Sequence, residues 1–383
     1  MKIGIEGIPF FGDRSGIGQF SKRLVEHMAE LDESPSLEII RPLMPHRKLA
    51  ELPIPENKKL SYRIVRWSPP IIYYQLFKRT GYAPPYDLVA LRKYDALVFF
   101  NFVAFPVRKK VPSILFIHDL SHVHYPEHTS PKNLVWLNKF VPRSIKRADK
   151  IVTISESSRN DIARFYGVPK KDIALVYPAL DHNEYKPRTS KEVTCVKKKY
   201  KITKPYILSV CTLEPRKNLL GVLKAFEMLP EELKQKYALV LVGGKGWLDG
   251  EIHDRFEALS KKYTIIKTGY ADDADLPPLY SGAELFVYPA FYEGFGMPPL
   301  EALACGAPVI TADNSSLPEA VGNAAITVKA ADTEALSANM IKVLEDKKLQ
   351  EKLRQAGFKH AAKFSWEKSA KDMIEVINSV VKK

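Results

Sequence analysis

Short apolar runs alternate with segments of helical period along most of the chain. The runs are rich in β-branched residues, as expected for strands buried in a parallel sheet. The segments between them repeat apolar positions at helical spacing, which indicates helices with one buried face. In the first half the strand candidates are KIGIEG (2–7), ALVFF (96–100), SILFIHDL (113–120), KIVTIS (150–155) and IALVYPAL (173–180). Strands that alternate with helices predict a doubly wound α/β fold.

The alternation stops between residues 181 and 205, in a charged stretch with no strand candidate, and then starts again. We interpret this stretch as the connection between two domains. The second series of strand candidates is PYILSV (205–210), YALVLVGG (237–244), TIIKTGY (264–270), LFVYPA (285–290), APVITAD (307–313) and AAITVK (324–329). The pattern predicts two Rossmann-like domains, residues 1–200 and residues 201–364.

The last segment, FSWEKSAKDMIEVINSVV, has an apolar stripe at helical spacing, formed by Ala370, Met373, Ile374, Val376, Ile377 and Val380. Such a stripe must be buried against another element. We expect this helix, residues 365–383, to cross back and pack on the N-terminal domain.

The three cysteines, Cys195, Cys211 and Cys305, are far apart and have no C-x-x-C spacing. An odd number of scattered cysteines fits neither a disulfide framework nor a zinc cluster. The chain begins with MKIGIEGIPF, which lacks the features of a signal peptide, and no apolar run reaches the roughly 18 residues of a membrane span. We expect a soluble, cytoplasmic protein with reduced thiols.

The net charge of +14 comes entirely from the N-terminal half. Residues 1–200 contain 34 Lys and Arg against 20 Asp and Glu, whereas residues 201–383 contain 24 of each. Half of the excess lies in residues 41–79, which also contain Trp67, Tyr73, Tyr74 and Phe77. Basic residues mixed with aromatic ones suit an anionic membrane surface, so this window is a candidate for peripheral association with the inner face of a membrane. An ordinary solvated face over an amphipathic helix explains the same composition.

In an open parallel sheet, ligands bind beyond the carboxyl ends of the strands, so the loops after the strands are candidate sites. The first loop, FFGDRSGIGQF, contains Gly16 and Gly18, which free the backbone to approach a ligand at the start of a helix. It is not the dinucleotide fingerprint, because Ser21 stands where the third glycine would fall. The chain has no Walker motif either, since its only Gly-Lys pair is followed by Gly246 rather than by Ser or Thr. A Gly-x-Gly turn can equally be structural.

Two further loops carry groups suited to proton transfer and to anion binding. His118 and Asp119 end the run SILFI, where an imidazole can donate or accept a hydrogen bond near neutral pH. Arg216 and Lys217 follow PYILSV just before a helix, and together they could neutralise a diphosphate without a metal ion. Each pair also has a simpler explanation. His118 could be a histidine that is hydrogen-bonded to local backbone, and Arg216 with Lys217 could form an exposed basic turn.

The loop FYEGFGMPPLEALACG places Glu293 and Glu301 on either side of a tight turn that leads into a helix. If this helix begins near Pro298, the free amides of Phe295 to Leu300 point out of its N-terminus, where phosphate oxygens are favoured. Ionised carboxylates only accept hydrogen bonds, and each can bind two neighbouring hydroxyls of a sugar or ribose ring. The loop therefore predicts a site for an anion and a polyol.

Together these motifs resemble glycosyltransferase family 4. The resemblance is carried by EGFGMPPLE with its E-x7-E spacing, by EPRKNL and LVGG before it, and by ACGAPVI and SSLPE after it. It runs from the first glycine-rich loop through TISESS to the closing FSW segment, is strong over residues 209–322 and is thin over residues 30–95. It implies a retaining transferase with the GT-B fold, in which two Rossmann-like domains face a cleft.

The resemblance also implies a role for each candidate residue. Glu301 would hold the ribose of a nucleotide-sugar donor, and Glu293 the hydroxyls of its sugar. Arg216 and Lys217 would bind the diphosphate and stabilise the departing nucleoside diphosphate, and His118 would lie near the transferred sugar. The remaining donor contacts are expected from Gly16, Gly18, Phe295, Gly296, Met297 and Leu300, with Tyr270 at the base.

The string DDADL contains Asp273 and Asp275, the D-x-D spacing with which the other large transferase fold, GT-A, holds a divalent metal. Here the aspartates precede a short helix, and we expect them to cap its exposed N–H groups. Because Arg216 and Lys217 are available for the diphosphate, we expect neither a metal ion nor another cofactor.

The resemblance, which extends to bacterial mannosyltransferases, implies a glycosyltransferase that moves a hexose to a glycan or lipid-linked acceptor, with mannose from GDP-mannose favoured. The acceptor is expected on the N-terminal domain. A UDP-sugar donor and a non-catalytic nucleotide-sugar-binding subunit of the same fold are the alternatives. A nicotinamide oxidoreductase would share the paired α/β domains, but the missing third glycine and the doubled glutamate argue against it. No nucleic-acid partner is expected.

Overall fold

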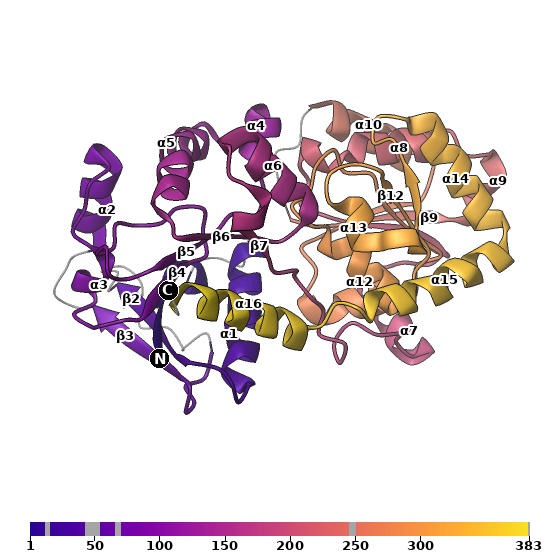
Figure 1. The fold of residues 1–383 in the computed structure, drawn as a ribbon. Helices are drawn as coiled ribbons and strands as arrows, with labels where there is room; N and C mark the ends of the chain where they lie inside the picture. Colours follow the sequence, from indigo (N-terminus) through magenta and orange to yellow (C-terminus); the bar gives the residue numbers. More distant parts are fainter. Residues whose placement is uncertain (12–15, 43–53, 66–69, 245–249, 382–383) are drawn as a thin grey trace. The chain divides into compact units, whose positions relative to one another are not determined.

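A computed structural model of the chain describes residues 1–11, 16–42, 54–65, 70–244 and 250–381. These residues form two compact units, the first made of residues 1–179 with 366–383 and the second of residues 180–365. Figure 1 shows the course of the chain through both. Each unit is a parallel sheet with helices packed on its faces, as the alternation of apolar runs and helical segments predicts.

The first unit contains a seven-stranded sheet with the order β3-β2-β1-β4-β5-β6-β7, and every neighbouring pair is parallel. The strands are β1 (Lys2–Glu6), β2 (Ser36–Pro42), β3 (Leu60–Val65), β4 (Ala96–Phe99), β5 (Ser113–Phe116), β6 (Lys150–Thr153) and β7 (Ile173–Leu175). All residues of β4 and β5 are buried, which explains their continuous apolar sequence.

The helices of the first unit are α1 (Gly16–Glu30), α2 (Pro70–Thr80), α3 (Tyr86–Val89), α4 (Ser121–His124), α5 (Pro131–Arg147), α6 (Glu156–Tyr166) and α16 (Trp366–Val381), with 3-10 turns η1 (Ile8–Phe11), η2 (Pro126–His128) and η3 (Lys170–Asp172). The last helix, α16, packs on α1, and all six residues of its expected apolar stripe are buried. Trp366 at its start lies 5.9 Å from the ring of Phe20 and stacks on His27.

Several residues of the basic window, residues 41–79, are part of the packed interior and the hydrogen-bond network of the first unit. Tyr73 and Phe77 are buried in the core, so the expectation that the aromatic residues face a membrane fails for both. Lys59 Nζ donates to three backbone carbonyls, and Arg63 Nε donates to a fourth at 3.1 Å. The Lys, Arg, Trp, Tyr and Phe side chains of this window that lie outside the described part of the structure are those of Arg41, Arg47, Lys48, Arg66, Trp67 and Tyr74.

The second unit contains a six-stranded parallel sheet with the order β10-β9-β8-β11-β12-β13. The strands are β8 (Tyr206–Val210), β9 (Ala238–Val242), β10 (Ile265–Gly269), β11 (Leu285–Tyr288), β12 (Val309–Ala312) and β13 (Ile326–Val328). Each lies within one of the six apolar runs of the second half, so this sheet follows directly from the hydrophobic pattern.

Helices pack against one another in two groups in the second unit, α8 with α10 and α14, and α12 with α11, α13 and α15. The helices are α7 (Ser190–Lys199), α8 (Leu219–Glu227), α9 (Glu231–Lys236), α10 (Gly250–Ser260), α11 (Leu276–Ser281), α12 (Met297–Cys305), α13 (Leu317–Val321), α14 (Thr333–Glu345) and α15 (Lys347–Ala361). The 3-10 turns are η4 (Pro215–Lys217), η5 (Asp273–Asp275) and η6 (Gly322–Ala324). Figure 1 shows both groups around the sheet.

The boundary between the units lies at residue 179 rather than at the expected residue 200. Residues 180–200 join the second unit because α7 packs on α11. Polar contacts support this packing: Lys199 Nζ lies 2.5 Å from Asp275 Oδ2, and the amide of Arg188 donates to Ser281 Oγ at 3.1 Å. The charged composition of the stretch, which suggested a linker, reflects the exposed face of α7.

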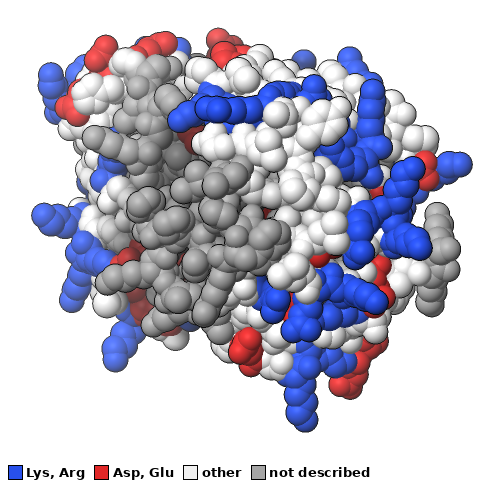
Figure 2. Space-filling view, turned by 90° about the vertical axis from the view of Figure 1, so that its left-hand side faces the viewer, with Lys and Arg blue, Asp and Glu red and all other residues white. Residues whose placement is uncertain are grey.

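Two surface properties of the described residues bear on partners. None of their helices is both long and apolar enough to cross a bilayer. Figure 2 views the side of the molecule on which α2 lies in Figure 1, and there Lys and Arg stand along both sides of the described surface, most densely on the right of the view, beside an uncharged area.

Candidate functional site

The strand order of the second unit reverses between β8 and β11, which are neighbours in the sheet although β9 and β10 separate them in sequence. Loops that follow two such strands diverge to opposite faces and leave a crevice at the carboxyl edge of the sheet. The loop after β8 contains Arg216 and Lys217, and the loop after β11 contains Glu293. The topology therefore explains why these three residues, far apart in sequence, come together.

Asn218 ties the two loops to each other. It has a left-handed backbone, with φ of 57°, and its side chain caps α8 by accepting from the amide of Gly221 at 3.1 Å. Its Nδ2 donates to the carbonyls of Pro289 and Ala330, at 3.1 and 2.6 Å. Since Asn218 is buried, these bonds fix the position of the residues just before it.

Arg216 and Lys217 converge on one oxygen of Glu293. Lys217 Nζ lies 2.5 Å from Glu293 Oε1, and Arg216 Nη1 lies 3.6 Å from the same atom. The hydroxyl of Tyr288, at the end of β11, donates to Oε1 at 2.8 Å. Arg216 Nη1 also donates to the carbonyl of Tyr292 at 2.6 Å. Both cations are thus held in place by their neighbours.

The second carboxylate oxygen of Glu293 is open. Among the described residues, Oε2 has no hydrogen-bond or ion-pair partner, and the side chain is 12% exposed. Burial by itself would raise the pKa of Glu293, but the charges of Lys217 and Arg216 and the hydrogen bonds from Lys217 and Tyr288 outweigh it, so the pKa is below its ordinary value. Glu293 therefore stays ionised and offers Oε2 as an acceptor.

The N-terminus of α12 has no side-chain cap. Gly296 precedes it with φ of 110°, where a Cβ would meet Leu317 at 2.8 Å, so only glycine fits. The prediction of free amides from Phe295 to Leu300 is wrong in part, because Pro298 and Pro299 have no N–H and Leu300 N–H donates to Gly296 O. The amide of Met297 remains at the first position of the helix, and Phe295 and Leu300 bury their side chains.

Glu301 lies in a separate, tyrosine-lined environment. The hydroxyl of Tyr280 donates to Glu301 Oε2 at 2.8 Å. Burial raises the pKa of Glu301 to about 7, and the carboxylates of Glu184 and Asp273 add to the rise, while hydrogen bonds from Tyr280 and Tyr185 oppose it. Unlike Glu293, Glu301 forms no ion pair with a Lys or Arg among the described residues.

The aspartates after β10 are engaged by other side chains. The expectation that Asp273 and Asp275 cap a helix is wrong, since neither makes a side-chain cap. Asp275 Oδ2 instead accepts from Lys199 at 2.5 Å and from Tyr200 at 2.7 Å, and Asp273 accepts from the Tyr270 hydroxyl at 3.0 Å. Within the described ranges, no group of three or more His, Cys, Asp and Glu has the arrangement of a metal site. The ring of Tyr270 is 58% exposed, as a base-stacking residue would need to be.

In the first unit, His118 follows β5 and is buried against the rings of Phe20 and Phe102. Its Nε2 lies 2.6 Å from the carbonyl oxygen of Phe100, which can only accept, so Nε2 carries the hydrogen and Nδ1 of the neutral ring is an acceptor. Burial lowers the pKa of His118, so the ring is neutral near pH 7. Ser158, in the segment TISESS, donates to the backbone oxygen of His118 at 3.1 Å.

Gly16 and Gly18 lie in the first turn of α1, which follows β1 at the reversal point of the first sheet. Gly16 is exposed, and a Cβ there would meet no described atom within 4 Å. Residues 12–15, the rest of this glycine-rich loop, lie outside the described residues.

Four site residues do not follow from the sequence: Tyr185, Asn218, Tyr280 and Tyr288. A buried tyrosine needs a partner for its hydroxyl, but sequence does not say which partner. Only Asn218 carried a local signal, because asparagine just before an apolar helical segment is a typical N-cap.

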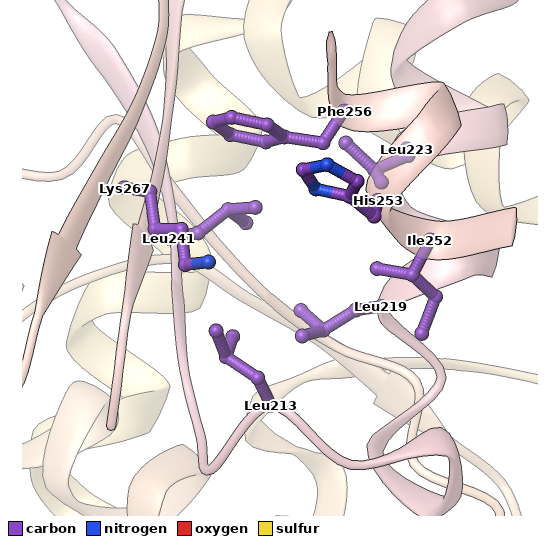
Figure 3. A pocket seen from close by; sticks show the side chains of 8 residues that line it. All are labelled: Leu213, Leu219, Leu223, Leu241, Ile252, His253, Phe256 and Lys267. Atoms are coloured by element: carbon purple, nitrogen blue, oxygen red, sulfur yellow. The ribbon is translucent and has the colours of Figure 1, made fainter. Parts of the chain in front are cut away.

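A hollow of about 300 Å³, including its open mouth, lies between Leu213 in the loop after β8, the helices α8 and α10 and the strands β9 and β10 (Figure 3). Its described lining is mainly apolar, and it contains the basic residues His253 and Lys267 but no carboxylate. A polyol needs acceptors as well as donors, so this hollow does not match the requirements of a nucleotide sugar. The loops after β8 and β11 supply both kinds of group, donors on Arg216 and Lys217 and an acceptor on Glu293.

Comparison with known proteins agrees with this arrangement. The family model Glycosyltransferase Family 4 matches residues 15–184, and Glycosyl transferases group 1 matches residues 193–360. The chain is 33% identical over 377 residues to O-antigen chain mannosyltransferase B of Escherichia coli, covering 96% of this chain and 97% of that protein. It is 32% identical over 244 residues to the serotype-specific mannosyltransferase WbdA of Escherichia coli, covering 61% of this chain and 29% of WbdA.

Solved structures share the fold at low sequence identity. Anabaena HepE in complex with UDP and glucose matches with a TM-score of 0.74 at 17% identity, covering 99% of this chain and 100% of HepE. WaaG, a glycosyltransferase involved in lipopolysaccharide biosynthesis, matches with a TM-score of 0.70 at 15% identity, covering 98% and 99%. The two parallel-sheet units thus define a glycosyltransferase enzyme of the two-domain α/β GT-B fold. The chain belongs to glycosyltransferase family 4.

Proposed function

We propose that the enzyme transfers mannose from GDP-mannose to a glycan or lipid-linked acceptor, with retention of anomeric configuration and without a metal ion. The choice of mannose is supported by the mannosyltransferase of Escherichia coli that is 33% identical over nearly the full length of both chains. One observation carries the chemistry: two cations hold Oε1 of Glu293 and leave Oε2 open. Use of a nucleotide sugar would place the reaction in the cytoplasm.

Arg216 and Lys217 are the groups that would stabilise the leaving nucleoside diphosphate. When the bond between the sugar C1 and the phosphate oxygen breaks, the electron pair stays on the diphosphate. Cations that are already fixed before the donor arrives stabilise this charge without reorganising, which is a large contribution to catalysis. Arg216 and Lys217 are fixed in this way by Glu293 and by the carbonyl of Tyr292. The amide of Met297 at the uncapped N-terminus of α12 adds a donor for the phosphates.

Glu293 and Glu301 would bind different parts of the donor. Glu293 is adjacent to both cations, so its open oxygen is placed for hydroxyls of the sugar that the diphosphate carries. Glu301 has no partner in common with Glu293 among the described residues, and its tyrosine-lined environment suits the paired hydroxyls of ribose. His118 would accept a sugar hydroxyl at Nδ1, a role that stays a prediction.

A UDP-sugar is the second candidate donor. HepE, which shares the fold, is described in complex with UDP and glucose. The exposed ring of Tyr270 could stack on uracil or on guanine, since every base has a π-face.

The test is donor turnover across GDP-, UDP- and ADP-sugars by the native chain, Arg216→Ala and Lys224→Ala. Lys224 is the matched control, because it is a cation on the neighbouring helix α8 that pairs with Glu251 at the surface. We expect the highest turnover with GDP-mannose, a loss of about 10²–10³-fold in kcat for Arg216→Ala, and native turnover for Lys224→Ala. Equal rates for native and Arg216→Ala would refute the site.

The same assay tests independence from metal ions. Turnover should survive EDTA, because Arg216 and Lys217 supply the positive charge that a metal ion would otherwise supply. A strict requirement for manganese would contradict the proposal.

A further inference from the structure

Helices α2 and α5 of the first unit contain no Asp or Glu. The basic residues on them are Lys78, Arg79, Lys132, Lys139, Arg143, Lys146 and Arg147. Across residues 70–148 the chain has twelve Lys and Arg against four Asp and Glu, and one of the four, Asp87, is fully buried in an ion pair with Arg108. Positive charge therefore accumulates here because little on these elements neutralises it.

The two helices form a single surface. Phe77 of α2 stacks on Phe140 of α5 with ring centroids 4.8 Å apart. Lys139 Nζ of α5 donates to the backbone carbonyl of Lys78 at 3.0 Å. The guanidinium of Arg143 lies against Gly81, just after α2. We call the exposed residues of α2 and α5, together with Tyr82, the α2–α5 surface.

The exposed side of α5 is a continuous stripe. Its members are spaced three or four residues apart, as one face of a helix requires, and they are Lys132, Val135, Lys139, Arg143 and Lys146. The opposite side is buried in the core through Phe140, Val141, Ser144 and Ile145. Lys139 is half-buried and donates to carbonyls at the end of α2, so the outward face of the stripe presents three exposed cations and Val135.

Three apolar side chains stand out of the α2–α5 surface. Val135 is 69% exposed, Leu76 is 44% exposed and Tyr82 is 80% exposed. Single exposed apolar residues are common on proteins, but these three are interspersed among cations. Figure 2 shows the same mixture of basic and uncharged side chains on this side of the molecule.

We propose that the α2–α5 surface binds an anionic lipid membrane, with the cations on the headgroups and the apolar side chains in the interface. Surface potential attracts Lys and Arg, and apolar insertion adds to it. A polyanionic glycan or nucleic acid would also use the cations, and a base could stack on Tyr82, but neither offers an apolar interior for Val135 and Leu76. The surface shares Leu76, Lys78 and Arg79 with the window of residues 41–79, but α5 supplies most of its cations, and Tyr73 and Phe77 of that window are in the core. This proposal does not depend on the identity of the donor.

Co-sedimentation of the full chain with vesicles tests the proposal. We expect binding to vesicles that contain phosphatidylglycerol, no binding to phosphatidylcholine vesicles, and weaker binding as salt rises. The double variant Lys132→Glu with Lys146→Glu should weaken binding at least about tenfold. Val135→Ser should also weaken it, without any change in charge. All three positions are exposed, so the variants should keep native circular dichroism.

The matched control is Lys170→Glu with Lys171→Glu, which makes the same change of charge at two exposed residues of η3, in the same unit but outside α2 and α5. It should bind vesicles almost as the native chain does. The proposal is overturned if the native chain does not bind, or if the control loses as much binding as the α5 variant. It is also overturned if Val135→Ser binds as the native chain does while a soluble polyanion displaces the vesicles, because the surface then recognises charge alone.

Discussion

Glu301 illustrates how neighbours rather than residue type decide what a side chain can do. Glu293 lies in the loop just before α12, and Glu301 lies in α12 itself. Two cations hold the pKa of Glu293 below its ordinary value, whereas burial raises the pKa of Glu301 to about 7. At neutral pH about half of the unliganded protein carries a proton on Glu301. Ribose hydroxyls donate to a carboxylate, so they favour the ionised form.

Donor binding should therefore strengthen as pH rises. Between pH 6 and pH 8 the ionised fraction of a carboxyl with pKa about 7 rises from about a tenth to about nine tenths, so the Kd for GDP-mannose should fall about tenfold. Calorimetric titration at several pH values measures this. Glu301→Gln should bind more weakly and without the pH dependence, whereas Glu345→Gln, an exposed control on α14, should behave as native. A native Kd that is constant from pH 6 to pH 8 would exclude this role for Glu301.

At the residue scale, the sequence indicates which charged side chains belong to the site, but it does not indicate which atoms they pair with. Arg216, Lys217 and Glu293 were chosen because they are charged residues at strand ends, and the structure brings them together. Their sharing of one carboxylate oxygen, with Tyr288 as a third donor, depends on distances across the sheet that no local pattern contains.

At the scale of elements, Asn218 connects the loop after β8 to the loop after β11. It caps α8 and donates to two carbonyls of other segments. Asn218→Ala should lower the free energy of unfolding by about 2–4 kcal/mol, because it removes a cap and leaves two buried carbonyls without a donor. It should also weaken GDP binding, since the cations lose their support.

A different helix cap separates these two effects. Asp346→Ala removes the side-chain cap of α15, where Asp346 accepts from Leu349 at 2.9 Å in an exposed position. This control should lower stability by about 1 kcal/mol and leave GDP binding unchanged. Thermal unfolding and calorimetric titration measure both quantities. Native GDP affinity in Asn218→Ala would show that the asparagine serves stability only.

Strands β2 and β3 show where the hydrophobic pattern is insufficient. The other eleven strands lie in apolar runs, but β2 includes Glu38 and β3 alternates polar with apolar residues. Glu38 is buried because Lys2 and Tyr94 both donate to it. A buried, paired carboxylate looks like a surface residue in sequence. The same limit applies to Asp273 and Asp275, which the sequence predicts to cap a helix but which Tyr270, Lys199 and Tyr200 hold.

At the scale of the whole molecule, the division of the chain decides which residues complete the second unit. Residues 180–200 bring Tyr185 to Glu301 and Lys199 to Asp275. A fragment of residues 180–365 should fold alone and bind GDP. A fragment of residues 201–364, cut where the composition suggests a linker, should unfold about 5–10 °C lower because the half-buried Tyr185 and the packing of α7 are missing.

Circular dichroism melting of both fragments checks this division, and titration with GDP checks that the longer one is intact. Equal melting temperatures would show that residues 180–200 do not belong to the second unit. The composition alone could not reveal this, because exposed charged helices and linkers contain the same residues. By contrast, the apolar stripe of the last helix was sufficient to predict its burial on the first unit, because a stripe of this length has to be covered.

The central claim is that Glu293 contacts the sugar while Arg216 and Lys217 contact the diphosphate. The most direct test measures both GDP affinity and mannose transfer in the variant Glu293→Gln. Glutamine keeps the shape of the side chain but removes the charge that neutralises the two cations. The account predicts that GDP binds at least as tightly as to the native chain, while transfer from GDP-mannose falls about 10²-fold or more. Native transfer rates, or a loss of GDP affinity as large as the loss of transfer, would contradict it.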